Sequence, residues 1–228
     1  MKTGRKTESR RELKARAARL AAALEKLYPQ ARISLNFATP WQCLVATILS
    51  AQCTDERVNQ VTPTLFRAIP DIPAMAAAPL GEIERLIRST GFFRQKAKSL
   101  RGAARAILEK FDGEVPSTME RLLMLRGVGR KTANVLLGHV FGKPGLVVDT
   151  HVRRVAFRLG LTRERDPDAI EQALRQILPD EQWTPFSMRL ILHGRRICVA
   201  RRPLCRSCVL LPDCRRAGVK VPIIGQTA

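Results

Sequence analysis

Two stretches of the sequence hold residue types that can do chemistry at short spacing. The first is Leu125–Val135, in which two glycines two positions apart are followed by Arg130 and Lys131. Glycine lets the backbone turn tightly and bring its N–H groups close to an anion, and a helix that starts after the turn adds its own free N–H groups. The pattern therefore predicts a helical hairpin that binds phosphate. The residues expected to line this anion site are Gly127, Val128, Gly129, Arg130 and Thr132.

The two cations at the predicted helix start have the unfavourable sign for stability, because the N-terminal end of the helix dipole repels positive charge. Phosphate binding or chemistry accounts for them better than folding does. An amine attacks carbon only in its neutral form, which a helix N-terminus and the neighbouring Arg130 both favour. Lys131 is therefore a candidate nucleophile. The alternatives are a plain hairpin with a glycine turn, and Lys131 as one more phosphate-binding cation.

The second stretch contains four of the six cysteines, spaced x6, x2 and x5 within seventeen residues. This density suits a tetrahedral metal ion or a cubane cluster, and the spacing does not separate zinc from iron–sulfur. Unrelated structural cysteines are the alternative. Two further basic residues of the x6 loop, Arg201 and Arg202, are placed to contact phosphate. The predicted metal ligands are Cys198, Cys205, Cys208 and Cys214.

The charge balance restricts the partner. Forty Lys and Arg face twenty Asp and Glu, which gives a net charge of +20 and predicts a polyanionic partner such as DNA, RNA or an anionic membrane surface. Apolar stretches such as Cys43–Leu49 are far shorter than the ~20 residues of a spanning helix, so we expect no membrane partner. The segment Met1–Leu20 has eight basic and two acidic residues but no following apolar region, as in a protein of the cytoplasm rather than a secreted one. We expect this segment to be a solvated, partly disordered tail that also touches nucleic acid.

The elements that must position these residues are almost all helical. Apolar residues recur at helical spacing through most of the chain, which predicts an all-α fold of roughly ten helices. The short apolar run Leu146–Val148 is expected to be an extended connection, and the chain after Ala217 is expected to be loose. Helix starts are expected at the caps or cap–proline pairs Thr39–Pro40, Thr54, Ser117 with Glu120, Asp166–Pro167 and Thr184–Pro185.

Together these features resemble the endonuclease III family of helix–hairpin–helix DNA glycosylases, from about Leu35 to Arg216. The cysteine spacing is typical of the iron–sulfur members of that superfamily. The segments that carry the resemblance are Leu49–Gln52, Gly113–Pro116, Gly127–Asn134, Val148–Val152, Ile191–Arg195 and the four cysteines.

The resemblance implies a [4Fe–4S] cluster on the four cysteines and two helical domains that flank a DNA-binding cleft. Residues 33–143 would form a six-helix barrel domain with the helix–hairpin–helix at about 117–141. Residues 1–32, a basic tail and a helix, would join the cluster domain 144–216, and 217–228 would be a loose tail. The expected partner is double-stranded DNA that contains damaged pyrimidines or abasic sites, bound by a monomer.

The activity that the resemblance implies is that of a bifunctional glycosylase and abasic-site lyase for oxidised pyrimidines in base excision repair. Lys131 would attack the sugar C1′, expel the base and form a Schiff base, after which β-elimination cuts the strand. Asp149 would stabilise the developing positive charge on the sugar or help to move protons. Its structural alternative is a helix N-cap, and one residue can do both.

A base inside a duplex must flip out before it can be reached. Gln52 and Phe92 are the candidates for filling the gap, with a core aromatic as the alternative for Phe92. His151 is expected to contact DNA or to be a hydrogen-bonded structural residue. The chain departs from the family at Arg126, where proline is usual, and at the bulky Phe92–Arg94 segment, which bears on lesion preference.

Two competing functions remain at this stage. The first is a monofunctional glycosylase, similar to adenine-specific mismatch relatives. Those relatives lack the lysine and usually carry a further C-terminal domain, so Lys131 and the end of the chain at Ala228 argue against it. The second is a DNA-binding module with a structural or redox-sensing metal cluster, in which Lys131 and Asp149 only bind and cap.

Overall fold

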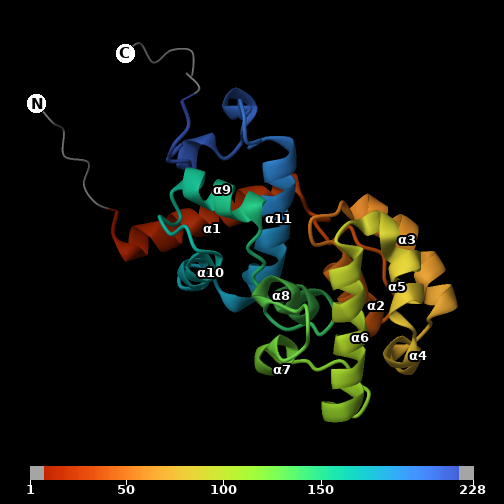
Figure 1. The fold of residues 1–228 in the computed structure, drawn as a ribbon. Helices are drawn as coiled ribbons and strands as arrows, with labels where there is room; N and C mark the ends of the chain where they lie inside the picture. Colours follow the sequence, from red (N-terminus) through yellow and green to blue (C-terminus); the bar gives the residue numbers. More distant parts are fainter. Residues whose placement is uncertain (1–7, 221–228) are drawn as a thin grey trace, which may run out of the picture. The chain divides into compact units, whose positions relative to one another are not determined.

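The computed structural model describes residues 8–220 and divides the chain into two compact units. Ile33–Gly145 form one, here called the hairpin unit; Met1–Arg32 and Leu146–Ala228 form the other, the cysteine unit. Both are built from helices (Figure 1). Strands are absent from the described residues, and Leu146–Val148 is an extended connection, which confirms the all-α fold class.

A short apolar helix forms the centre of the hairpin unit. Eight of the ten residues of α2 are buried, and α2 packs against α3, α6 and α8. A helix that is apolar nearly all round has no face for solvent and is expected at the centre of a core. The elements of this unit are α2 (Pro40–Leu49), α3 (Asp55–Ala68), α4 (Ile72–Ala77), α5 (Leu80–Ile87), η1 (Arg88–Thr90), α6 (Phe93–Lys110), α7 (Met119–Leu123) and α8 (Arg130–His139).

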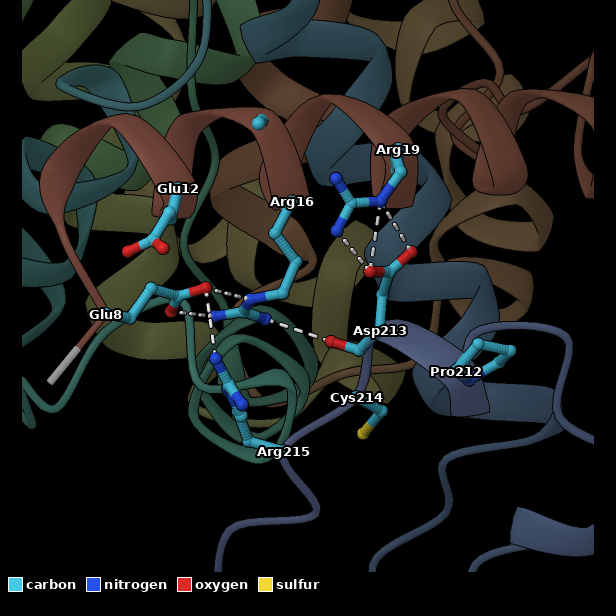
Figure 2. A pocket seen from close by; sticks show the side chains of 9 residues that line it. Glu8, Glu12, Arg16, Arg19, Pro212, Asp213, Cys214 and Arg215 are labelled. Carbon is cyan, nitrogen blue, oxygen red and sulfur yellow. Dashed lines mark hydrogen bonds and ion pairs between the residues drawn. The ribbon is translucent and has the colours of Figure 1, made fainter. Parts of the chain in front are cut away.

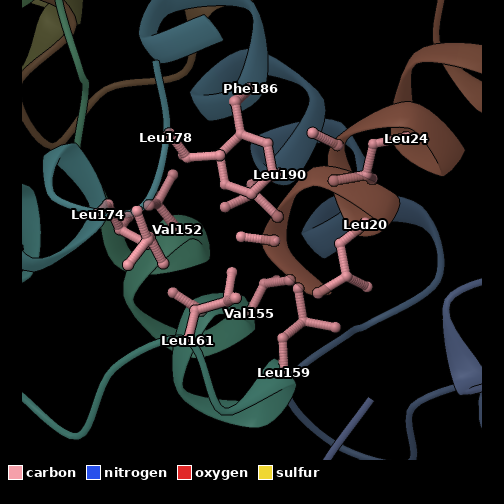
Figure 3. Packing of buried hydrophobic residues seen from close by; sticks show 14 of the residues in the cluster. Leu20, Leu24, Val152, Val155, Leu159, Leu161, Leu174, Leu178, Phe186 and Leu190 are labelled. Atoms are coloured by element: carbon pink, nitrogen blue, oxygen red, sulfur yellow. The ribbon is translucent and has the colours of Figure 1, made fainter. Parts of the chain in front are cut away.

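The cysteine unit brings the N-terminal helix α1 onto helices from the second half of the chain. Leu20 and Leu24 of α1 pack with Val152 and Val155 of α9 and with Phe186 of α11 in one apolar cluster (Figure 3). The elements of this unit are α1 (Arg10–Leu27), α9 (Thr150–Leu159), α10 (Pro167–Arg175), η2 (Asp180–Gln182), α11 (Trp183–Arg196), η3 (Cys205–Ser207) and η4 (Leu211–Asp213).

A buried arginine of α1 ties this helix to distant parts of the same unit. The Arg16 guanidinium donates to the carbonyls of Leu159 at 2.7 Å and Gly160 at 2.8 Å. It also donates to the Asp213 carbonyl at 3.0 Å and pairs with Glu8 (Figure 2). Only 4% of Arg16 is exposed. Because each of these carbonyls belongs to a turn at the end of a helix, the guanidinium supplies donors that the helices themselves cannot.

The structure corrects the expectation for the N-terminal segment. Residues 10–20 are not a solvated tail but the first part of α1, which starts with a capping box between Ser9 and Glu12. The apolar side of this helix is buried in the cysteine unit. Residues 1–7 lie outside the described part, and so does most of the C-terminal tail expected after Ala217, namely 221–228.

Most of the expected helix starts are confirmed. The side chains of Thr39, Thr54 and Asp166 each accept a backbone N–H at the start of a helix. Two expectations are wrong. The cap of α7 is Thr118, not Ser117, since the Thr118 hydroxyl accepts from the Arg121 amide. The turn η2 runs directly into α11 at Trp183, so Thr184 and Pro185 lie inside the first turn rather than starting it.

No helix in the described residues is long and apolar enough to cross a membrane.

Candidate functional site

The glycine turn predicted between two helices is present in the hairpin unit. It joins α7 to α8, and Val128 donates its N–H to the Leu125 carbonyl at 3.1 Å. Gly127 has a φ of +82°, which L-residues rarely adopt, whereas Gly129 has an extended backbone and is the N-cap of α8. Val128 is 8% exposed, so this side chain packs inward rather than outward.

The turn is seated against a face of small residues on α6. A Cβ atom at Gly127 would lie 2.7 Å from the Ser99 Cβ, and one at Gly102 would lie 2.9 Å from the Arg126 Cδ. The backbone of the turn and the stem of Arg126 therefore both pass close to α6. This explains how an arginine fits where the related family usually has proline: its stem lies over Gly102.

No side chain of the N-cap or first turn offsets the positive electrostatic field at the N-terminus of α8. Its N-cap, Gly129, has no side chain to accept an N–H, and the first turn contains no acidic residue. Lys131 is exposed on this turn and Thr132 is partly exposed. The arrangement can hold an anion against backbone N–H groups and place an amine beside it.

Gln52 and Phe92 lie on two loops of the hairpin unit and share an unusual backbone. Gln52 has a φ of 52° and Phe92 a φ of 46°, and both side chains are exposed. Because 66% of Phe92 is exposed, the interpretation of this residue as a core aromatic is wrong. Phe93 is only partly exposed and stacks against the Arg94 guanidinium at 5.5 Å, so Phe92 alone presents an open ring.

Asp149 is the N-cap of α9 in the cysteine unit. Its Oδ1 accepts the Val152 N–H at 2.8 Å, and the residue is half-buried. The structural role weighed for this carboxylate is therefore present. The cap uses Oδ1 alone, so the second oxygen, Oδ2, can act on a bound group without giving up the cap.

Two histidines of the cysteine unit, His151 and His193, are held inside the fold. Burial lowers the pKa of His151, whose Nδ1 lies 3.1 Å from an Arg154 nitrogen. Burial also lowers the pKa of His193, to about 4; this ring lies between the Tyr28 hydroxyl at 3.4 Å and the Cys208 sulfur at 3.5 Å. Both rings are therefore neutral near pH 7, and His193 acts as a structural residue. His151 is partly exposed and remains a predicted DNA contact.

The four spaced cysteines line one pocket together with Leu159, His193 and other residues of the loop. Burial and the negative charges of the other three thiolates raise the pKa of Cys208 to about 11. Burial and the negative charges of the Cys198 and Cys205 thiolates raise the pKa of Cys214. Thiols in this setting keep their protons unless a cation offsets the charge. Within the part of the chain that the structure describes, no three candidate ligands are gathered tightly around a single-ion position.

An arginine missed by the sequence reasoning organises this loop. Arg158 of α9 donates to the carbonyls of Cys198, Val199 and Ala200, and to the Cys198 sulfur at 3.5 Å. The loop that it holds carries Arg201 and Arg202, both exposed. Helical spacing on α9 places Arg158 next to the buried face of that helix. It cannot identify the partners of Arg158, because the first of them lies forty residues later in the chain.

A buried lysine in the hairpin unit was also missed. Lys96 of α6 is 5% exposed and donates to two backbone carbonyls, of Leu49 and Thr90. The sequence held a signal for it: Lys96 lies at helical spacing with the buried residues Leu100, Ala103 and Ile107. A lysine on the apolar face of a helix indicates a buried partner.

Several known proteins are similar to this chain in sequence and in fold. The model of the HhH-GPD superfamily, base excision DNA repair proteins, matches residues 45–180. Endonuclease III of Synechocystis sp. is 57% identical over 205 residues, which cover 90% of this chain and 94% of the relative. A non-covalent endonuclease III–DNA complex matches with a TM-score of 0.85 and 41% identity over 89% of this chain and 95% of that one. A trapped endonuclease III–DNA covalent intermediate matches with a TM-score of 0.85 and 41% identity over 89% of this chain and 96% of that one.

The seating of the turn on α6 makes a prediction about its glycines. We expect Gly127→Ala to lower the free energy of unfolding by about 2–4 kcal/mol, because a Cβ there meets Ser99 and forces a left-handed backbone on alanine. Gly129→Ala is the matched control, since a Cβ at Gly129 meets nothing within 4 Å and φ is negative. Urea denaturation followed by circular dichroism measures both. Equal stability of the two variants would contradict the close contact with α6.

Proposed function

Since this chain belongs to the HhH-GPD superfamily of base excision DNA repair proteins, and within it to the endonuclease III family, we propose that it is a bifunctional DNA glycosylase and abasic-site lyase. It excises oxidised pyrimidines in base excision repair and cleaves the strand by β-elimination. The observation that carries the proposal is the exposed Lys131 on the first turn of α8, directly after a glycine turn without a side-chain cap.

DNA binding by this chain follows from its charge and from the hairpin. A net charge of +20 attracts a polyanion, and the uncapped amides at the start of α8 suit one phosphate. We propose double-stranded DNA with damaged pyrimidines or abasic sites as the substrate, bound by a monomer in the cytoplasm. Further DNA contacts are assigned to Arg130, Thr132, His151, Arg201 and Arg202.

We assign to Gln52 and Phe92 the role of filling the gap that the flipped nucleotide leaves in the duplex. Both are exposed, and both have a left-handed backbone that costs free energy unless the surroundings impose it. An exposed phenylalanine also gains nothing for folding. A flat ring and an amide can replace a base by stacking and by hydrogen bonding to the estranged partner base.

We assign the chemistry to Lys131 and Asp149. The neutral Lys131 amine attacks C1′, the glycosidic bond breaks, and the base leaves with the bonding electron pair and takes up a proton. The amine nitrogen loses a proton, the C1′–O4′ bond of the sugar ring breaks, O4′ takes up a proton, and a protonated Schiff base forms at C1′. This Schiff base loses a proton from C2′, and the C3′–O bond breaks so that the phosphate on the 3′ side leaves with the electron pair. The Asp149 carboxylate stabilises the positive charge that develops on the sugar, while its Oδ1 stays bonded to the Val152 amide.

We assign a [4Fe–4S] cluster to Cys198, Cys205, Cys208 and Cys214. The donor set fits, because four thiols share one pocket, burial and mutual repulsion keep two of them protonated, and a cationic iron cluster removes that penalty. When bound, the cluster supplies folding free energy by fixing the loop. The protein's own contribution is the Arg158 side chain, which holds the first turn of the loop through three carbonyls.

The nucleophile can be tested by trapping. With an abasic duplex and borohydride, the protein is expected to form a covalent DNA complex, because reduction fixes the Schiff base. We expect Lys131→Gln to abolish trapping while DNA affinity in a gel-shift assay changes by no more than several-fold. Lys110→Gln, an exposed lysine at the end of α6, is the control and should trap normally. Trapping that persists in Lys131→Gln would refute the assignment.

The two roles of Asp149 can be separated by two substitutions. Asparagine caps a helix as well as aspartate, so Asp149→Asn is expected to keep stability but to reduce base release on the order of a hundredfold. Asp149→Ala removes the cap as well and should lose about 1 kcal/mol of unfolding free energy. Thymine-glycol excision under single-turnover conditions, DNA affinity and urea denaturation measure these effects. A loss of affinity equal to the loss of excision in Asp149→Asn would contradict the catalytic role.

The cofactor assignment predicts a brown protein with iron and acid-labile sulfide in equal amounts. Cys208→Ala is expected to lose the visible charge-transfer absorbance and most of the iron, because it removes a ligand that the loop cannot replace. Cys53→Ala, a partly exposed cysteine of the hairpin unit, should keep both. Stoichiometric zinc in a colourless protein would overturn the iron–sulfur assignment.

A further inference from the structure

The loops that carry Gln52 and Phe92 require contacts that fix the positions of their backbones. Gln52 follows the end of α2, and Phe92 lies between η1 and α6. Both residues are exposed and have positive φ, so their own side chains do not anchor the loops. A buried group that contacts both backbones would fix the loops where their own exposed side chains do not.

Lys96 is that group. Its Nζ donates to the Leu49 carbonyl at 2.8 Å and to the Thr90 carbonyl at 2.7 Å. Leu49 is the last residue of α2, and Thr90 is the last residue of η1. Gln52 follows the first anchor by three residues, and Phe92 follows the second by two. One ammonium thus joins the bases of both loops within the hairpin unit.

The physical chemistry of this contact favours a rigid joint. Burying an ammonium is costly, and burial lowers the pKa of Lys96 from its ordinary value. The cost is offset because carbonyls at helix ends have no partner within the helix and carry the negative end of the helix dipole. The Thr90 hydroxyl also donates to the Ile87 carbonyl at 2.8 Å, which fixes the second anchor from its own side.

We propose that Lys96 is a positioning residue for base flipping, which sets the spacing of Gln52 and Phe92 by joining the ends of α2 and η1. The inference rests on the proposed gap-filling role of those two residues. Lys96 touches neither the substrate nor the reacting atoms in this scheme. Its contribution is to keep two strained loops ready before DNA arrives, so that little ordering is left to the flipping step.

The experiment uses the full-length, metal-loaded protein, a thymine-glycol duplex for the excision assay, and two further DNA probes. The first is a duplex with 2-aminopurine opposite a tetrahydrofuran abasic analogue, whose fluorescence rises when the estranged base is unstacked. The second is a single-stranded oligonucleotide with an abasic site, which has no gap to fill, probed by borohydride trapping. Misplacement by ~1 Å can cost about a hundredfold in rate. We therefore expect Lys96→Met to reduce the fluorescence rise and duplex excision on the order of tenfold or more.

Single-strand trapping by Lys96→Met should stay within roughly twofold of the unsubstituted protein, because a positioning role for the two loops does not act on the Lys131 amine. Lys98→Met, an exposed lysine two residues later on α6, is the matched control and should behave normally in both assays. If Lys96→Met does not fold, Lys96→Gln takes its place, since an amide keeps two N–H donors on a side chain one atom shorter. It is expected to show the same selective loss in a smaller amount.

The outcomes separate the two proposals. An equal loss in single-strand and duplex assays would mean a purely structural role and would overturn the inference. If Gln52→Ala and Phe92→Ala abolish the fluorescence rise while Lys96→Met keeps it, Lys96 is not the positioning residue and the gap-filling assignment stands. If neither alanine variant changes the signal, the gap-filling assignment fails, and the inference about Lys96 fails with it.

Discussion

In both units a buried basic side chain donates to backbone carbonyls at the ends of helices. Lys96 does so for α2 and η1 in the hairpin unit, and Arg16 does so for the turns after α9 and at η4 in the cysteine unit. Helix ends leave carbonyls that only a donor from elsewhere can satisfy, and an unpaired buried carbonyl costs about 1–3 kcal/mol. The segments that follow α2, η1 and η4 carry residues to which we assign DNA contact or metal binding, namely Gln52, Phe92 and Cys214. Their positions therefore depend on a few cations that never reach the substrate.

The large excess of positive charge thus has two uses. A small number of cations are buried and hold helix ends, as with Arg16 and Lys96, while most are exposed and account for the affinity of the chain for a polyanion. The N-terminus of α8 also contributes exposed positive charge, because neither a side-chain cap nor an acidic residue offsets the positive end of that helix. Self-repulsion among the exposed cations lowers stability, and binding of DNA relieves it. Because the chain belongs to a superfamily of base excision DNA repair proteins, DNA is the polyanion that this charge is expected to bind.

Asp149 combines an observed role in the fold, the N-cap of α9, with the role in the reaction that we propose for it. A capping carboxylate is fixed in orientation by the helix amide that it accepts, which removes rotamer freedom before substrate binds. The oxygen that does not cap is then held at a constant position and remains available to a developing positive charge. At Gly127, too, local geometry and packing are linked, because the left-handed backbone lets the turn lie directly against Ser99.

Local patterns in the sequence determined the all-α class, most helix starts, the glycine hairpin, the cysteine loop and the family, because caps, turns and helical spacing act within a few residues of one another. They also left local errors: adjacent hydroxyls at Ser117 and Thr118 compete for one cap, and only the backbone geometry selected Thr118. The tertiary structure alone decided that Phe92 is exposed and that the helix expected within residues 1–32 already starts at Arg10. It alone revealed Lys96 and Arg16, whose carbonyl partners lie 47 and 143 residues away. A hydrogen bond between such distant residues leaves no periodic trace, since its geometry exists only once the helices have packed.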